Sequence, residues 1–211
     1  MSVGIVILAA GESARMGVPK QLLAYRGTTL LRHAIDTAHS IPDAPVVVVL
    51  GAHSEKIRPA LEDSRTLIAE NPNWREGMAS SLHAGLNTLL AAHPAISAVI
   101  FLVCDQPLLS ANTLANIIAT HEQTGRPIVA SEYSGALGVP ALFARSIFPE
   151  LLALSGAQGA QQIIEAYREN AIGIPFPEGA IDLDTPADYA AFGENSLATA
   201  HKRSRAQSRA I

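Results

Sequence analysis

The sequence predicts an α/β fold, a Rossmann-like, doubly wound and mostly parallel sheet within a single domain. Short apolar runs rich in β-branched residues alternate along the chain with longer segments whose apolar residues recur every three or four positions. The run Val46–Leu50 is apolar without interruption, which is typical of a strand buried on both faces of a parallel sheet. Strands that alternate with helices in this way form sheets covered by helices on both faces.

The predicted elements follow one another in the order that such a sheet requires. Strands are expected at 4–9, 46–50, 67–70, 98–103 and 127–130. Helices are expected at 29–39, 54–61, 80–90 and 111–124. Ser54 and Ser110 stand where a serine side chain caps a helix, and Gly125 ends the last of these helices. Beyond residue 130 the glycines predict a small β-hairpin at 131–143, laid over the sheet.

Length and composition indicate one globular domain. The 211 residues are 48% hydrophobic and 16% charged, and a chain of this length buries about 70% of its unfolded surface. No apolar run reaches the roughly 18 residues of a membrane span, and the N-terminus lacks the charged region of a secretory signal, so we expect a cytoplasmic protein. The single cysteine, Cys104, excludes an internal disulfide and a cysteine-based zinc site.

The charges are distributed unevenly along the chain. The last 15 residues contain no acidic residue and four basic ones, Lys202, Arg203, Arg205 and Arg209. Residues 1–196, the expected domain, therefore carry an excess of acidic groups, which argues against nucleic acid as a partner. Residues 197–211 have almost nothing apolar to bury, and we expect a basic, disordered tail there.

The segment 6–20 is where an apolar strand leads into a loop with Gly11, Gly17, Arg15 and Lys20. Glycines let backbone N–H groups approach a ligand closely, and the two cations add positive charge, so the loop suits a chain of phosphates. The spacing excludes a Walker A loop, in which Ser or Thr directly follows Gly-Lys, and also the G-x-G-x-x-G fingerprint. The expected ligand is a nucleoside triphosphate.

Two carboxylates stand where the ends of strands would bring them near that loop. Asp105 follows the strand 98–103, and Asp184 lies in a late loop. Mg²⁺ prefers hard oxygen ligands and is usually held by one or two carboxylates together with substrate phosphates. Structural explanations stay open for both, because Asp105 can cap a turn and Asp184 or Thr185 can cap a helix that has Pro186 at its first position.

Other chemistries lack their patterns. The chain has no G-x-S-x-G elbow and no H-E-x-x-H, and its seven histidines show no tight metal-binding spacing. Cys104 precedes Asp105, and a neighbouring carboxylate makes a thiol less reactive, so we expect a packed strand cysteine and not a nucleophile.

The first loop also carries a resemblance to a known family. Its pattern L-A-A-G-x-S-x-R-M-G-x-P-K, at 8–20, resembles the signature loop of the MobA-like nucleotidyltransferases. The resemblance extends over about residues 4–192 through N-P-x-W-x-x-G-M-x-x-S-L at 71–82, D-Q-P at 105–107, G-V-P-A-L-F at 138–143 and D-x-D-T-P-x-D at 182–188. The chain looks most similar to the molybdenum cofactor cytidylyltransferases, which attach CMP to the terminal phosphate of molybdopterin.

The resemblance implies roles for individual residues. Catalysis is expected from Arg15, Lys20 and Asp105, and Mg²⁺ binding from Asp105 and Asp184. Nucleotide binding is expected from Ala9, Ala10, Gly11, Gly17, Gly77, Ser81 and Gly138. The Ala-Ala-Gly form of the loop, in place of Ala-Gly-Gly, favours CTP over GTP. The implied partners are a phosphorylated acceptor such as molybdopterin and a molybdoenzyme or its maturation factor, with no nucleic acid and no membrane.

The segment 70–82 allows structural roles beside the implied ones. A serine such as Ser80 at a helix start normally caps it, although a helix N-terminus also suits an anionic or carbonyl ligand, and both uses can coexist. Trp74, the only tryptophan, is more often a packing residue than a platform for a base.

One departure from the family pattern leaves the acceptor open. Such cytidylyltransferases often read G-D-x-G-A-R where this chain has Gly156-Ala157-Gln158-Gly159-Ala160-Gln161, so that Ala157 and Gln161 replace an acid and an arginine. One alternative is a sugar- or polyol-phosphate nucleotidylyltransferase, whose loop also reads L-A-A-G and P-K. A second is a non-catalytic protein that binds and delivers a nucleotide or molybdopterin.

Overall fold

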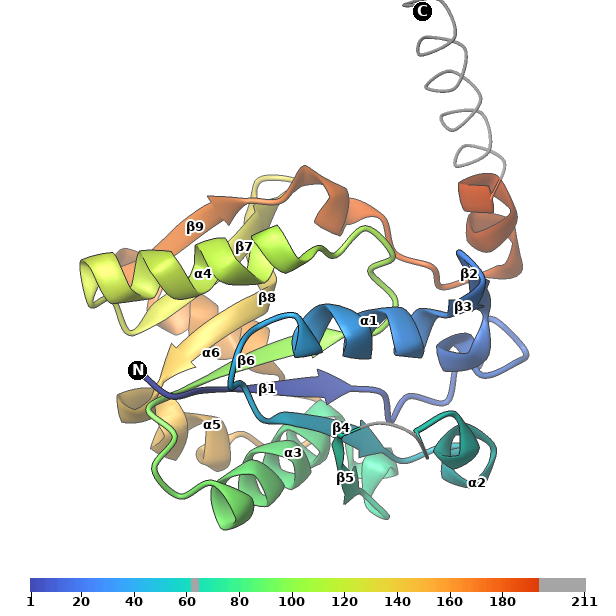
Figure 1. The fold of residues 1–211 in the computed structure, drawn as a ribbon, viewed down its shortest axis with the longest axis horizontal. Helices are drawn as coiled ribbons and strands as arrows, with labels where there is room; N and C mark the ends of the chain where they lie inside the picture. Colours follow the sequence, from blue (N-terminus) through green and yellow to red (C-terminus); the bar gives the residue numbers. More distant parts are fainter. Residues whose placement is uncertain (62–64, 194–211) are drawn as a thin grey trace, which may run out of the picture.

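A computed structural model of the chain describes residues 1–61 and 65–193. Its centre is a seven-stranded sheet with helices on both faces (Figure 1). The strands are β1 (Val3–Leu8), β4 (Val46–Leu50), β5 (Leu67–Glu70), β6 (Ala98–Val103), β7 (Ile128–Tyr133), β8 (Ala136–Ala144) and β9 (Ala171–Pro175). Their order is β5-β4-β1-β6-β8-β7-β9, and only β8 runs antiparallel to its neighbours. The predicted fold class is confirmed.

The helices form two layers, one on each face of the sheet (Figure 1). One layer contains α1 (Leu30–His39), α2 (Ser54–Ile57) and α4 (Ala111–Thr124), and the other contains α3 (Met78–Ala92), α5 (Phe148–Ala153) and α6 (Ala160–Ala166). Because side chains alternate along a strand, Ile5 and Ile7 of β1 pack in the first layer and Val6 packs in the second. The sheet is therefore buried on both sides, as the uninterrupted apolar runs predicted.

Most of the predicted helix boundaries hold. Ser110 caps α4, since its hydroxyl accepts from the backbone N–H of Thr113, and Gly125 ends that helix with a φ of 64°. The prediction for Ser54 is wrong: the cap residue of α2 is His53, with no side-chain hydrogen bond to the helix. The region 54–61 divides into α2 and a 3₁₀ turn, Arg58–Leu61.

The strand pair beyond residue 127 lies within the sheet and not over it. β8 pairs with β6 as well as with β7, and residues such as Val129 and Leu142 are fully buried. Apolar residues on both faces of these strands need cover on both sides, which only a position inside the sheet provides. A separate two-stranded hairpin, which the sequence did not reveal, is formed by β2 (Ala24–Tyr25) and β3 (Thr28–Thr29).

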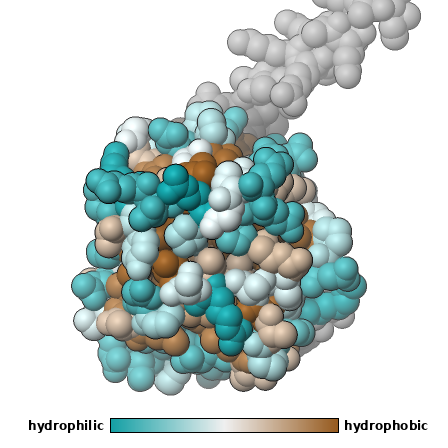
Figure 2. Space-filling model, turned by 90° about the vertical axis from the view of Figure 1, so that its left-hand side faces the viewer, coloured by the Kyte–Doolittle hydropathy of each residue, from teal (hydrophilic) through white to brown (hydrophobic). Residues whose placement is uncertain are grey.

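The division into a domain at 1–196 and a basic tail at 197–211 stays a prediction. Residues 186–193 are helical, whereas 194–196 and the basic tail 197–211 lie outside the described residues. Within the described residues, no helix has both the length and the apolar character needed to cross a bilayer. Figure 2 views the molecule from the side at which β1 begins, and hydrophilic and hydrophobic residues are interspersed on that face.

Candidate functional site

A cavity of about 230 Å³ lies where β1 and β6 end. Its walls come from the loop after β1, from the turn before α3 together with the start of that helix, and from the end of β6. Open α/β sheets bind ligands outside the carboxyl ends of their strands, so the cavity lies where this fold class places a ligand.

A buried glutamine holds the loop after β1 in place. Gln21 is 1% exposed, and its Nε2 donates to the carbonyl oxygens of Ala9 at 2.8 Å and Gly11 at 3.1 Å. Ser13 Oγ accepts from the backbone N–H of Lys20 at 3.1 Å and ties the two ends of the loop together. Gln21 was not predicted as a site residue. The sequence alone does not show which carbonyl oxygens would accept from a buried glutamine side chain.

The same loop offers hydrogen-bond donors to a ligand. Ala9 N–H donates to Val49 O, but the N–H groups of Ala10 and Gly11 have no acceptor within the described part of the chain. A Cβ built on Gly11 would meet no atom within 4 Å, so its backbone faces open space. Free amides beside a cavity bind acceptor atoms such as phosphate or carbonyl oxygens.

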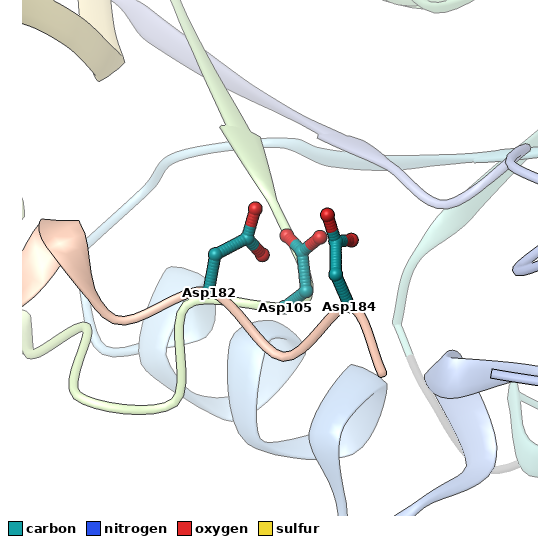
Figure 3. A group of neighbouring side chains, drawn as sticks. All are labelled: Asp105, Asp182 and Asp184. Atoms are coloured by element: carbon teal, nitrogen blue, oxygen red, sulfur yellow. The ribbon is translucent and has the colours of Figure 1, made fainter. Parts of the chain in front are cut away.

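Three carboxylates gather beside the cavity. Oxygens of Asp105, Asp182 and Asp184 lie within 4.8 Å of one another, and the three side chains point to the same side (Figure 3). Lys20 Nζ donates to Asp105 Oδ2 and, at 3.0 Å, to Asp184 Oδ1. Arg15 also pairs with Asp184, at 2.5 Å. The structure therefore brings together the four charged residues that the sequence predicted for the site, and it adds Asp182 to them.

The electrostatics of this cluster favour a bound cation. Burial and then the neighbouring Asp105 raise the pKa of Asp182 to about 7. Burial alone would lower the pKa of Lys20, but Asp105 and Asp184 outweigh it and hold that pKa above its usual value. Asp105 Oδ1 is buried and, within the described residues, has no hydrogen-bond partner. Crowded carboxylates with an unpartnered buried oxygen fit a divalent ion with hard oxygen ligands.

The wall at the start of α3 depends on a glycine. Gly77 has a φ of +118°, and a Cβ there would lie 2.2 Å from Gly156 O. The same carbonyl accepts from the N–H of Ala79 at 3.2 Å. The segment at 156 therefore packs directly on this wall, and only glycine fits at position 77.

Ser80 does not cap α3, although a serine at a helix start normally does so. Gly77 precedes α3 and gives no side-chain cap, while the Ser80 hydroxyl donates to the carbonyls of Gly77 and Asn73. Trp74 lines the cavity and also packs against the core, and Arg75 lies 4.2 Å from the centre of its ring. Trp74 thus combines the packing role with a place at the cavity.

The predicted site residues do not all line the cavity. Those that do are Ala9, Ala10, Gly11, Lys20, Gly77, Ser81 and Asp105. Gly138 instead lies on β8 against the hydroxyl of Tyr133. Gly17, with a φ of +75°, and the side chain of Arg15, 72% exposed, belong to the outer part of the loop.

Two further neighbours of Asp105 have structural roles. Gln106 Nε2 donates to Val139 O at 3.1 Å and to Gly179 O at 3.3 Å, which fixes the Asp105 turn to β8. Cys104 is buried, and burial followed by Asp105 raises its thiol pKa to about 12. A thiol with so high a pKa is a poor nucleophile, in agreement with the packing role predicted for it.

Comparison with protein families gives a match over most of the chain. The MobA-like NTP transferase domain matches residues 5–171. The crystal structure of Rv0371c from Mycobacterium tuberculosis H37Rv is similar at 30% identity, with a TM-score of 0.77, over 92% of this chain and 98% of that one. A second crystal structure, of Rv0371c in complex with manganese, is 28% identical with a TM-score of 0.74, over 90% of this chain and 97% of that one. In the present chain, Asp105, Asp182 and Asp184 form a group that could hold a metal ion.

Curated proteins match over shorter stretches. Nicotine blue oxidoreductase of Paenarthrobacter nicotinovorans is 40% identical over 119 residues, 55% of either chain. The bifunctional protein GlmU of Mycobacterium marinum is 32% identical over 131 residues, 59% of this chain and 26% of its own length. The chain thus spans about half, or less, of the length of these relatives.

Proposed function

The chain belongs to the MobA-like NTP transferase family, and from that membership we propose that it transfers CMP from CTP to the terminal phosphate of molybdopterin, releasing pyrophosphate. The observation that carries the proposal is the contact of Lys20 with Asp105 and Asp184 beside a cavity whose other wall presents the N–H groups of Ala10 and Gly11, which have no acceptor among the described residues. Cations, acids able to hold a metal, and amide donors are the three groups that a triphosphate requires.

In this mechanism an acceptor phosphate oxygen attacks the α-phosphorus, and the bond from that phosphorus to the β-phosphate bridging oxygen breaks. No general base is required, because the attacking oxygen is already anionic. Lys20 exchanges its carboxylate partners for phosphate oxygens, and together with Arg15 it offsets the charge that grows on pyrophosphate. Asp105, Asp182 and Asp184 would hold Mg²⁺, which supplies further neutralisation of the phosphates.

The choice of CTP rests on the Ala9-Ala10-Gly11 form of the loop, which lines the cavity. The choice of molybdopterin rests on the resemblance of the motifs alone. Ala157 follows the carbonyl that contacts Gly77, so the segment with the altered residues lies next to the cavity wall. Without the acid and the arginine of the usual pattern, this segment offers an acceptor no charge from Ala157 or Gln161.

A sugar- or polyol-phosphate acceptor is therefore the second candidate. The first loop supports it, since Leu8-Ala9-Ala10-Gly11 and Pro19-Lys20 also fit the loop pattern of that class. The non-catalytic alternative, a protein that delivers nucleotide or molybdopterin, is supported only by the altered segment 156–161.

The similarity to nicotine blue oxidoreductase adds a redox candidate. Against it stands the first loop, which lacks the glycine spacing of a dinucleotide-binding turn. An acidic cluster paired with Lys20 also suits the charge of a metal-bound triphosphate better than a hydride transfer.

A single panel of assays distinguishes these candidates. The purified protein is incubated with each of the four NTPs, Mg²⁺ or Mn²⁺, and molybdopterin, a sugar 1-phosphate or a polyol phosphate, and both pyrophosphate and the mass of the product are measured. We expect pyrophosphate and a cytidylylated molybdopterin. Product with a sugar phosphate alone would replace the acceptor, whereas oxidation of NADPH by a quinone-like dye without pyrophosphate release would favour the redox candidate.

A further inference from the structure

The orientation of one buried amide is fixed by its surroundings. Asn71 follows β5 and is 4% exposed. Its Oδ1 accepts from the backbone N–H of Asn73 at 3.0 Å. Because a backbone N–H can only donate, the side-chain oxygen must face Asn73 and the amide nitrogen must face the other way.

That amide nitrogen faces two serines of α3. Asn71 Nδ2 donates to Ser80 Oγ at 2.9 Å and to Ser81 Oγ at 3.0 Å, so both hydroxyl oxygens act as acceptors. Ser80 directs its own hydrogen to Gly77 O, at 2.8 Å, and Asn73 O, at 3.0 Å. The Ser81 hydroxyl, by contrast, has no acceptor for its hydrogen among residues 1–61 and 65–193. Ser81 lines the cavity, so this hydrogen is available to a ligand.

We propose that Asn71 is a positioning residue that makes the Ser81 hydroxyl a hydrogen-bond donor to the nucleobase. This inference rests on the proposed nucleotidyl transfer and specifies how its nucleotide is recognised. The donor selects a base that presents a carbonyl oxygen or an unprotonated ring nitrogen at this point, as cytosine does with O2 and N3. A base that presented an amino group there would place two donors against each other.

The lining of the cavity indicates the base and not the phosphates as the partner of Ser81. The part contributed by segment 74–81 is uncharged and contains Trp74 and Met78. The charged lining residues, Lys20 and Asp105, come from other elements. An apolar wall with one oriented donor suits a flat heterocycle, whereas phosphates require the cations.

The test measures binding of CTP and of inorganic tripolyphosphate, each with Mg²⁺, by calorimetry. The variants are Ser81→Ala, Asn71→Asp and the double variant, with Ser80→Ala as the matched control. An aspartate at 71 would accept from Asn73 N–H and from both serine hydroxyls, an arrangement that favours its ionised form. The Ser81 hydrogen would then turn away from the cavity without a change in side-chain size.

We expect Ser81→Ala to weaken CTP binding about 5- to 10-fold, the effect of one uncharged hydrogen bond. Asn71→Asp should weaken CTP binding by a similar factor, and the double variant should bind CTP no more weakly than Asn71→Asp alone. Ser80→Ala should change the affinity for CTP by less than about 2-fold, because its hydrogen is directed to backbone carbonyls. Affinity for tripolyphosphate should stay the same in Ser81→Ala.

Three results would overturn the inference. The first is that the losses of CTP affinity from Asn71→Asp and Ser81→Ala multiply in the double variant. The second is an equal loss of tripolyphosphate affinity in Ser81→Ala. The third is a Ser80→Ala variant that binds CTP as weakly as Ser81→Ala. Melting temperatures identify a variant that fails to fold, and if Asn71→Asp does so, Asn71→Ala takes its place in the same cycle. A native protein that binds no NTP would instead refute the proposed function.

Discussion

At the scale of single residues, Lys20 links the carboxylates to the cavity. It contacts two of the three carboxylates, and it lines the cavity together with Ala10 and Gly11 of the first loop. A cation in this position can neutralise charge on a leaving pyrophosphate only if it exchanges a carboxylate for the ligand. Its function therefore depends on competition between acids and phosphates for one ammonium group.

Replacing Lys20 or Asp105 should reduce turnover without unfolding the protein. We expect Lys20→Ala and Asp105→Ala to lower kcat/KM by about 10² or more, which corresponds to roughly 2.7 kcal/mol of transition-state stabilisation. Lys56→Ala, which removes an exposed lysine from α2, is the control. Pyrophosphate release provides the measurement, and near-normal rates in either site variant would contradict the assignment.

The sequence identified residues that follow strands or glycines more readily than residues whose partners lie elsewhere. Asp105 and Lys20 could be selected because the ends of parallel strands share one edge of the sheet, and Asp184 because its segment resembles the D-x-D-T-P-x-D motif of the family. Gln21 and Asn71 could not, since a buried amide is distinguished only by acceptors and donors on distant segments. Asp182 was not selected, because the sequence alone does not show whether Asp182 lies near Asp105 as Asp184 does. The folded loop brings both carboxylates to Asp105.

At the scale of elements, the wall of the cavity depends on contact between the turn before α3 and the segment at 156. Gly77→Ala would introduce a Cβ 2.2 Å from Gly156 O at a φ of +118°. We expect this variant to unfold more readily by about 1–3 kcal/mol, from backbone strain and the clash together. Urea unfolding checks the value, with Gly11→Ala as the control, because a Cβ at Gly11 would meet no atom. Equal midpoints for the two variants would show that the contact contributes nothing.

A second prediction concerns the pH dependence of stability that arises from His33 on α1. His33 Nε2 lies 3.1 Å from Leu109 O, an acceptor, and the Tyr25 ring lies at 4.9 Å. Burial lowers the pKa of His33, although the Leu109 carbonyl opposes the shift. The unfolded chain therefore binds a proton at this residue before the native state does, and stability is lost as the pH falls below about 6.5.

His33→Gln should reduce this dependence. Between pH 7 and pH 5, the midpoint of urea unfolding should fall less in the variant than in the native protein. His39→Gln is a useful comparison, because burial also lowers the pKa of His39 on the same helix. A His33→Gln variant with an unchanged pH profile would show that His33 keeps its ordinary proton affinity.

Element boundaries were predictable where the pattern was local. The helix ending at Gly125 was found because its cap, Ser110, and its left-handed glycine directly flank the helix in sequence. The place of β8 in the sheet was not found, because it depends on pairing with β6, more than thirty residues away. Glycines around 135 correctly indicated a hairpin but not which strand it would pair with.

At the scale of the whole molecule, ligands should stabilise the native state. A ligand that binds only the folded form raises apparent stability by about 2.7 kcal/mol at 100 times its Kd. We expect the melting temperature to rise with CTP and Mg²⁺ together and to fall back when EDTA removes the metal. A rise with CTP that EDTA leaves unchanged would show that the carboxylates do not hold a metal for the nucleotide.

In the proposed mechanism the nucleotide phosphates lie between the first loop and a divalent ion held by Asp105, from the middle of the chain, and Asp184, from its C-terminal part. Anomalous diffraction from crystals grown with Mn²⁺ and a non-hydrolysable CTP analogue tests it most directly. We expect a manganese peak bonded to Asp105 and Asp184, with Lys20 on the phosphates. A peak elsewhere, or Lys20 still paired with Asp105 when the nucleotide is bound, would contradict it.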